Sequence, residues 1–188
     1  MVPIGQLTET RLRARLIAST WIEISRLMVS IEQRMQIAAP IQRCFDLSRS
    51  IEVHLLGTER TGERAVDGVT TGLIGPGEFV RWRAKHLGVC QHLTSKITAF
   101  DSPRHFQDTM IEGAFKFMQH DHFFTAIAES RTEMRDRFTF AAPLSVLRNI
   151  AEQLFLKRYM DSFLRHRNEI LKQVAESDRW QDFIPQPK

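Results

Sequence analysis

Hydrophobic and polar residues alternate along most of the middle of the chain, in stretches separated by turn residues such as Gly75-Pro76-Gly77. Alternation of this kind is typical of β-strands with one buried face. Because most of the stretches are joined by short turns, we expect an antiparallel sheet. The pattern predicts strands at 29–37, 64–73, 79–87, 90–100, 105–110, 115–127 and 131–140, and two short helices, at about 41–47 and 50–55, after the first strand.

The period changes after Pro143, and from Ser145 to Val174 apolar residues recur every three or four positions. This period predicts an amphipathic helix of about thirty residues, roughly 45 Å long. A helix of this length needs a partner for its apolar side, and the concave face of the sheet is the obvious one. The expected fold is therefore α+β, with a curved, seven-stranded antiparallel sheet wrapped on a long C-terminal helix.

The first 28 residues differ in character from the rest of the chain. They hold four arginines, two glutamates and a loosely amphipathic apolar pattern, without the apolar core and cleavage site of a secretory signal. We interpret 1–28 as an N-terminal extension, helical or poorly ordered, 29–176 as one domain and 177–188 as a C-terminal tail. A start of the natural protein at Met28 stays open, because a strand pattern follows that residue at once.

Charge and composition exclude several classes of protein. The chain has 188 residues and a formal charge of +4, half of which lies in 1–28, so we expect no nucleic-acid partner. Two cysteines, Cys44 and Cys90, exclude a disulfide scaffold and a multi-cysteine zinc module. No apolar run approaches the roughly 20 residues of a membrane span, which leaves at most weak contact with a membrane surface. We expect a cytoplasmic location and, since no nucleotide-binding motif is present, no cofactor.

Alternation also assigns side chains to the two faces of the sheet. In 79–87 the charged residues Arg81, Arg83 and Lys85 share the wet face, so Trp82 and His86 point inward. The strand 115–127 is less clear. Its residues Gln119 and Asp121 suit water, which favours an inward face that carries the two histidines, His120 and His122.

The expected inner face is therefore apolar with several polar side chains, which are His86, Asp108, His120, His122 and Asp136. Burying such groups is costly unless they are hydrogen-bonded, and a sheet that needed only a core would carry leucine and valine there. The mixture is typical of a cavity for a ligand with a polar group. We predict that this cavity is lined by Trp82, His86, Asp108, Met110, Met118, His120, His122, Phe124, Asp136, Phe155 and Tyr159.

A series of short motifs follows the predicted elements along the domain. They are Ile37-Ala38-Ala39-Pro40 before Cys44-Phe45-Asp46, Gly77-Glu78 before Val80-x-Trp82-x-Ala84-x-His86, Phe106-x-Asp108, Gly113-Ala114-Phe115 before His120-x-His122, Thr132-x-Met134-x-Asp136, and Pro143-Leu144. In this order they resemble the SRPBCC superfamily, which includes START-like domains, polyketide cyclase/dehydrases and coenzyme Q-binding proteins. The resemblance covers about 29–176 and implies a helix-grip fold with a deep hydrophobic cavity between sheet and helix. The chain departs from the family pattern in its N-terminal extension, and in Met118 where relatives often carry an aromatic residue.

Three functions stay open, because this fold hosts carriers, receptors and enzymes. The first is binding of a small hydrophobic ligand, such as a lipid, a quinone or a polyketide-like molecule. The second is a cyclase or dehydratase that uses inward His/Asp pairs, drawn from His86, Asp108, His122 and Asp136, as acid and base. The third is a protein-interaction module with a vestigial cavity.

The inward histidines have plainer interpretations as well. His120 and His122 lie two positions apart on one strand face, a spacing at which two imidazoles can share an ion with His86 or Asp108. Nothing in the spacing requires an ion, so we expect no metal. Structural histidines bonded to neighbouring strands, and His/Asp pairs that only bridge the sheet, are the alternatives. The sequence leaves the oligomeric state open.

Overall fold

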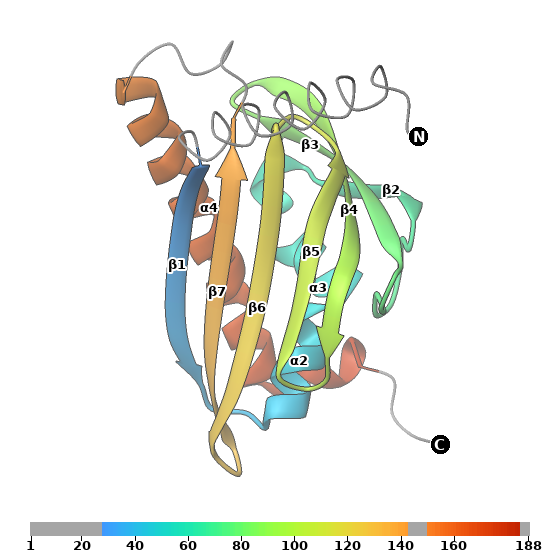
Figure 1. Ribbon diagram of the computed structural model, residues 1–188. Coiled ribbons are helices and arrows are strands. Elements are labelled where there is room, and N and C mark those ends of the chain that lie inside the picture. The colour runs from blue at the N-terminus through green and yellow to red at the C-terminus, as the bar shows by residue number, and fades with distance from the viewer. Residues whose placement is uncertain (1–27, 143–149, 185–188) are drawn as a thin grey trace, which may run out of the picture.

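The computed structural model describes residues 28–142 and 150–184. The predicted extension before Met28, the helix start predicted at Ser145 and the end of the tail lie outside these residues. The described residues form seven strands in an antiparallel sheet with the order β1-β7-β6-β5-β4-β3-β2 (Figure 1). The strands are β1 (Met28–Ile37), β2 (Arg64–Gly68), β3 (Phe79–His86), β4 (Val89–Asp101), β5 (His105–Glu112), β6 (Phe117–Ala128) and β7 (Arg131–Ala141).

Strands β3 to β7 follow one another across the sheet because each is joined to the next by a short connection. Strand β1 lies at the far edge and pairs with β7 along its whole length, from Met28 opposite Ala141 to Ile37 opposite Thr132. The predicted antiparallel sheet of seven strands is therefore confirmed.

The second strand is shorter than the alternation predicted, since it ends at Gly68 instead of extending to Leu73. Gly68 has a φ of 73°, and a Cβ atom there would collide with the backbone of Phe79. After this turn the chain runs to the helical side of the molecule, where Leu73 bridges Ser50. The apolar alternation in 69–73 therefore belongs to a loop that packs against a helix.

The helices lie on the side of the sheet that faces away from the viewer in Figure 1. Both short predicted helices are present, and the second begins where Ser50 Oγ accepts a hydrogen bond from the Val53 amide, a standard N-cap. In the described part of the chain, no helix has both the length and the apolar character that crossing a membrane requires. The helical segments are α2 (Ile41–Ser48), α3 (Ile51–Gly57), α4 (Ile150–Ala175) and the short 3₁₀ turns η1 (Glu59–Thr61) and η2 (Asp178–Asp182).

Two apolar clusters hold the sheet against the helices. The first lies by α2, where the rings of Phe100, Phe106 and Phe124 each meet Phe45 edge to face, with centroids 5.3 to 5.7 Å apart. The second lies by the first half of α4 and is built from Ile31, Met118, Phe138, Phe140, Met160 and Leu164. The long C-terminal helix thus packs against the sheet, as predicted.

The inner face of β6 carries the two histidines, as the alternation favoured, and both are buried. The outer face differs from the expectation, because Asp121 is only 2% exposed. Its carboxylate accepts hydrogen bonds from Gln107, Gln119 and Arg137 side chains, at 2.7 to 3.1 Å. The alternation predicted a solvent-exposed carboxylate on the outer face, and the structure has a buried, hydrogen-bonded one there.

Candidate functional site

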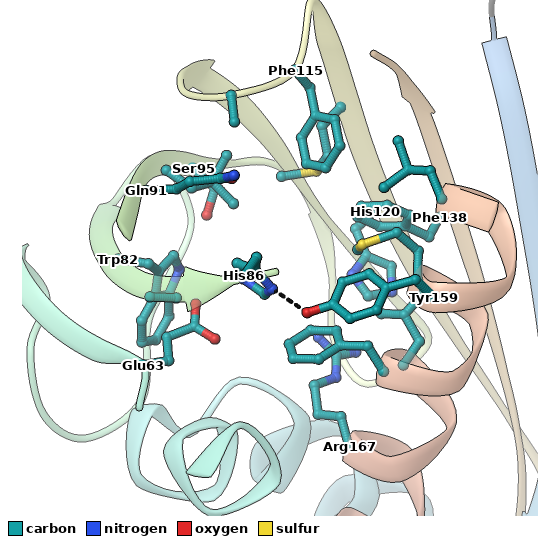
Figure 2. Close-up of a pocket in the computed structure, with 18 of the residues that line it drawn as sticks. Glu63, Trp82, His86, Gln91, Ser95, Phe115, His120, Phe138, Tyr159 and Arg167 are labelled. Carbon is teal, nitrogen blue, oxygen red and sulfur yellow. Dashed lines mark hydrogen bonds between the residues drawn. The ribbon is translucent and has the colours of Figure 1, made fainter. Parts of the chain in front are cut away.

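A cavity of about 200 Å³ lies between the sheet and α4 (Figure 2). Most of its wall is apolar, with a few polar side chains that converge on it, which is the usual make-up of a small-molecule site. The apolar lining includes Trp82, Ala84, Leu93, Phe115, Met118, Phe138, Leu156, Met160, Phe163 and Leu164. The polar lining includes His54, Glu63, His86, Gln91, Ser95, Asp108, His120, Tyr159 and Arg167.

Strand β3 supplies one wall of the cavity by simple alternation. Trp82, Ala84 and His86 face inward, while Arg83 and Lys85 face solvent. Opposite them, α4 presents Tyr159. Figure 2 shows His86 and Tyr159 meeting across the cavity.

His86 and Tyr159 form the hydrogen bond that joins the sheet to the helix within the cavity. The His86 Nδ1 atom lies 2.8 Å from the Tyr159 hydroxyl oxygen. Burial lowers the pKa of His86, although the Glu63 carboxylate opposes this effect. Burial also raises the pKa of Tyr159. Near neutral pH the pair is therefore an uncharged imidazole and an uncharged phenol.

A group of buried ionisable residues lies beside the cavity and centres on Asp136, which is 2% exposed. One carboxylate oxygen of Asp136 lies 2.7 Å from His122 Nδ1. The other oxygen accepts a hydrogen bond of 3.0 Å from Arg167 and lies 3.3 Å from His120 Nε2. The pairing of β6 with β7 explains this arrangement, because it places Asp136 directly opposite His122.

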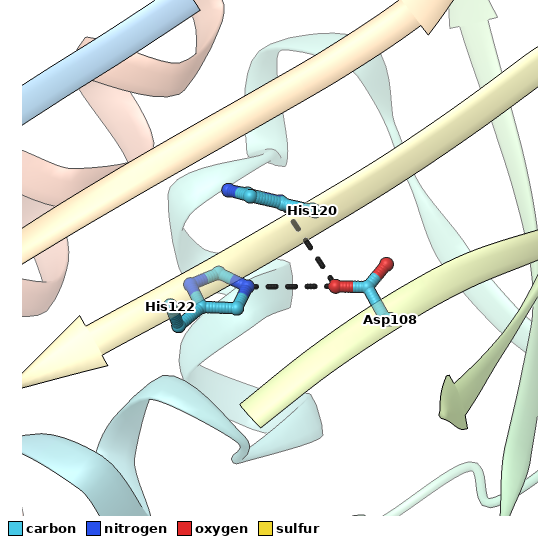
Figure 3. Close-up of side chains that lie close together, drawn as sticks. All are labelled: Asp108, His120 and His122. Atoms are coloured by element: carbon cyan, nitrogen blue, oxygen red, sulfur yellow. Dashed lines mark ion pairs between the residues drawn. The ribbon is translucent and has the colours of Figure 1, made fainter. Parts of the chain in front are cut away.

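Asp108 completes the group from the other side of β6, where the strand register sets it opposite His120. Its Oδ2 atom lies 3.4 Å from His122 Nε2 and 4.0 Å from His120 Nδ1 (Figure 3). Asp108 is 20% exposed and lines the cavity, as does His120. We call Asp108, His120, His122, Asp136 and Arg167 the buried polar cluster.

Charges within the buried polar cluster compensate one another. Burial opposes ionisation of Asp136, but the facing histidines outweigh it and hold the pKa of Asp136 well below its ordinary value. Burial would also lower the pKa of His122, yet the carboxylates of Asp136 and Asp108 reverse that effect and raise it. Burial, together with the neighbouring His122, lowers the pKa of His120 to about 4. His120 is thus neutral near pH 7.

A second histidine–carboxylate pair lies on the β3 side of the cavity. His54 stacks on Trp82 with ring centroids 4.1 Å apart, and its Nε2 atom lies 3.5 Å from Glu63. Burial opposes ionisation of Glu63, but His54 outweighs it and lowers the pKa of Glu63. The sequence interpretation missed both residues, because each lies outside the strands whose alternation was used.

Of the residues predicted to line the cavity, the structure brings together Trp82, His86, Asp108, Met118, His120 and Tyr159. His122 lies beneath them and lines a smaller adjoining cavity of about 60 Å³, whose wall also includes Asp108 and Arg167. Asp136 lies behind the histidines, where it contacts the cluster and does not line the cavity.

Three predicted lining residues lie elsewhere. Phe124 is part of the apolar cluster around Phe45, and Met110 packs against the cluster by the first half of α4. Phe155 is 57% exposed. Adjacent residues of a helix point about 100° apart, and it is Leu156 and Tyr159 that face the cavity. None of these three residues is among those that line the cavity.

Arg167 is the member of the buried polar cluster that the sequence interpretation overlooked. A signal for it exists, because Arg167 lies four residues after Phe163 and four before Leu171, in the middle of the apolar side of α4. A charged residue at such a position requires a buried partner. Asp136 is that partner.

No protein-family model and no curated protein matches the chain. Solved structures do match it. An aromatase/cyclase, Zhui from Streptomyces sp. R1128, is 16% identical over 79% of this chain and 94% of its own, with a TM-score of 0.63. A START superfamily protein from Mycobacterium smegmatis is 10% identical over 78% and 97%, with a TM-score of 0.61. The protein TTHA0849 from Thermus thermophilus is 18% identical over 79% and 100%, with a TM-score of 0.59.

Identities this low show a shared fold and nothing about a shared ligand or reaction. The matched structures include a START superfamily protein and an aromatase/cyclase, and their fold is that of the SRPBCC proteins that the sequence motifs resemble. The chain therefore has the helix-grip fold of these structures, with a cavity between the sheet and the C-terminal helix.

Proposed function

We propose that this protein binds a small, mostly apolar molecule between its sheet and α4. The observation that carries the proposal is the cavity of about 200 Å³, whose lining combines aromatic and aliphatic side chains with a few polar groups. A lipid, a quinone or a polyketide-like molecule has the matching chemistry. The comparison supports this class, because one similar protein is named as an aromatase/cyclase.

The lining also suggests how such a ligand is oriented. Phe115, Met118, Phe138 and Leu156 offer an apolar surface, while the His86–Tyr159 pair and Arg167 offer hydrogen-bond donors. A carbonyl or hydroxyl group on the ligand would be placed against these donors, with the carbon skeleton against the apolar wall. The apolar and polar parts of the cavity wall would thus set the orientation of the ligand.

The test is to extract the purified protein and to record its native mass spectrum. A co-purifying apolar molecule supports the proposal, and its release on denaturation identifies it. Uptake is then measured for the variant Ala84→Leu, which adds three carbon atoms inside the cavity, and for Ala126→Leu, which adds the same atoms at an exposed position of β6. We expect loss of uptake in the first variant only. Equal uptake by both variants would place the ligand elsewhere and would favour an interaction module.

A second candidate is an acid–base enzyme, a cyclase or dehydratase. The observation in its favour is that His86 and Tyr159 lie 2.8 Å apart and both line the cavity. A neutral imidazole paired with a phenol can accept and return a proton. His122 and Asp136 are poorer candidates than the sequence suggested, because they lie outside the main cavity and bond to each other.

Two substitutions distinguish the carrier from the enzyme once a ligand has been identified. In an enzyme, Tyr159→Phe and His86→Gln would lower turnover while ligand affinity changes little. In a carrier, the same variants change only affinity, and no product forms with the wild type. Turnover that is unchanged in both variants would remove this pair as catalysts.

A further inference from the structure

Three potential metal-ligand atoms meet at the edge of the cavity, from two neighbouring strands. Asp108 of β5 and His120 and His122 of β6 each present a nitrogen or oxygen atom, and these atoms all lie within 4.8 Å of one another. Figure 3 shows the carboxylate pointing between the two imidazole rings. The sequence spacing places only His120 and His122 on one strand face. The register of β5 against β6 places the carboxylate of Asp108 beside them.

The separations suit a shared cation better than a direct hydrogen bond. His122 Nε2 and Asp108 Oδ2 lie 3.4 Å apart, whereas a charge-assisted N–H···O bond is about 2.7–2.9 Å long. Two ligands of a tetrahedral ion with bonds of about 2.0–2.1 Å lie roughly 3.4 Å apart. His120 Nδ1 lies 4.0 Å from the same oxygen, so a small rotation of one ring would bring it to the same separation.

Asp136 lies on the far side of both rings and bonds to that of His122, as a carboxylate commonly does behind a metal-bound histidine. An ionised carboxylate only accepts hydrogen bonds, so His122 Nδ1, 2.7 Å from Asp136 Oδ1, carries the proton. The Nε2 atom of His122 is thereby turned toward Asp108. His120 Nε2 is buried, lies 3.3 Å from Asp136 Oδ2 and has no hydrogen-bond partner among the described residues.

The charges leave room for a cation as well. Asp108 and Asp136 carry two negative charges, and Arg167, which bonds to the outer oxygen of Asp136, supplies one positive charge. The remaining negative charge attracts a cation to the space between His122 and Asp108: a second proton on His122 neutralises it, and a divalent ion leaves a net charge of +1. These two occupants exclude each other, because both need the lone pair of Nε2.

We infer that Asp108, His120 and His122 form a site for a divalent transition-metal ion of the zinc type, with Asp136 as the group that orients His122. Two imidazoles and one carboxylate suit Zn²⁺ and its first-row neighbours, whereas Mg²⁺ and Ca²⁺ prefer all-oxygen sites. Because Asp108 and His120 line the cavity, a fourth coordination position would face it. The inference departs from the expectation of no metal, and it does not depend on what fills the cavity.

The test uses the full chain, stripped with a chelator and dialysed, and titrated with ZnCl₂ in a calorimeter. We expect one ion per chain at this site, and Co²⁺ in its place should give the visible absorption of a four-coordinate ion. Asp108→Asn and His120→Gln should each weaken Zn²⁺ binding by at least about tenfold, and Asp136→Asn by about 10–100-fold. His54→Gln is the matched control, since His54 also faces a buried carboxylate but belongs to no group of three potential metal ligands among the described residues.

Folding of each variant is checked by far-UV circular dichroism, and Asp108→Asn is the decisive variant because its side chain is 20% exposed at the cavity edge. If the wild-type protein binds no Zn²⁺, the inference is overturned, and a proton on His122 Nε2 is what links His122 to Asp108. Unchanged affinity in folded Asp108→Asn would overturn it too, because the ion would then be bound elsewhere. Either result leaves the ligand-binding proposal untouched, since that proposal is tested by extraction without added metal.

Discussion

Asp136 lies 2% exposed between two strands and a helix, and its carboxylate contacts both histidines of β6 and the guanidinium of Arg167. The desolvation of such a group is compensated only by these partners. When one partner of a buried ion pair is removed, the other is left charged in a medium of low polarity. The folded protein therefore tolerates a buried, ionised Asp136 only when His120, His122 and Arg167 are all present.

Asp136→Ala should lower the free energy of unfolding by about 3–5 kcal/mol, because Arg167 and His122 would lose their buried counter-charge. Urea denaturation, followed by circular dichroism, measures the change. Glu32→Gln is the control. Glu32 also pairs with arginines, Arg34 and Arg135, but its side chain is 40% exposed, so the loss should stay below about 1 kcal/mol. Equal losses in both variants would show that the buried polar cluster adds no special stability.

His86 makes stability depend on pH in a definite direction. Burial lowers its pKa below the ordinary 6.5, so in mildly acidic solution the unfolded chain binds a proton that the folded protein does not. The contribution of His86 to the unfolding free energy is therefore fully present above about pH 6.5 and is lost as the pH drops below that value. His86→Gln, which does not titrate, should lose less stability than the wild type between about pH 7.5 and about pH 5.5. Parallel pH profiles from urea titrations would contradict this prediction.

At the scale of strands, alternation predicted which face of β6 is buried. Its histidine face also carries Met118 and Phe124, and a shift by one residue would have turned both of these apolar side chains into water. What alternation lacks is the register between strands. Asp136 meets His122, and Asp108 meets His120, because of how the hairpins pair. The polar residues were therefore predictable one by one, and their contacts were not.

The long helix shows the same limit in another form. Its period predicted an apolar side, but the apolar residues spread over a wide arc, so the rotation of α4 about its axis depends on packing against the sheet and α3. Packing turns Leu156 and Tyr159 inward and leaves Phe155 in solvent. It also buries Arg167, whose partner, Asp136, helical periodicity does not identify.

The contact between α3 and α4 depends on the last residue of α3, Gly57. A Cβ atom at this position would lie 2.7 Å from Arg167 Cγ and 3.0 Å from its Cα atom. Gly57→Ala should therefore push the helices apart and cost about 1–3 kcal/mol, despite the better helix propensity of alanine. Gly75→Ala is the control, since its Cβ would meet only the flexible Glu78 carboxylate, at 3.3 Å. Chemical denaturation compares the two, and a stabilised Gly57→Ala variant would disprove the close contact.

At the scale of the whole molecule, the cavity separates two layers that would otherwise pack directly. Its wall draws on strands β3 to β7 and on α4, while the two apolar clusters hold the layers together and supply part of that wall. An unfilled apolar space loses the dispersion contacts that a close-packed core would make. The fold therefore keeps this cavity at some cost in stability.

Ala84→Leu tests this cost directly, because the residue lines the cavity and is 6% exposed. The added carbons enter a space of about 200 Å³, so they should bury apolar area without collision and raise the unfolding free energy by about 0.5–2 kcal/mol. The same substitution should abolish uptake of an apolar ligand. Ala126→Leu, at an exposed site on β6, should change neither quantity by much. If Ala84→Leu lowers both the unfolding free energy and the uptake, the space is already closed in solution. If it raises the unfolding free energy and lowers the uptake, the wild-type molecule keeps an open cavity at the expense of core packing.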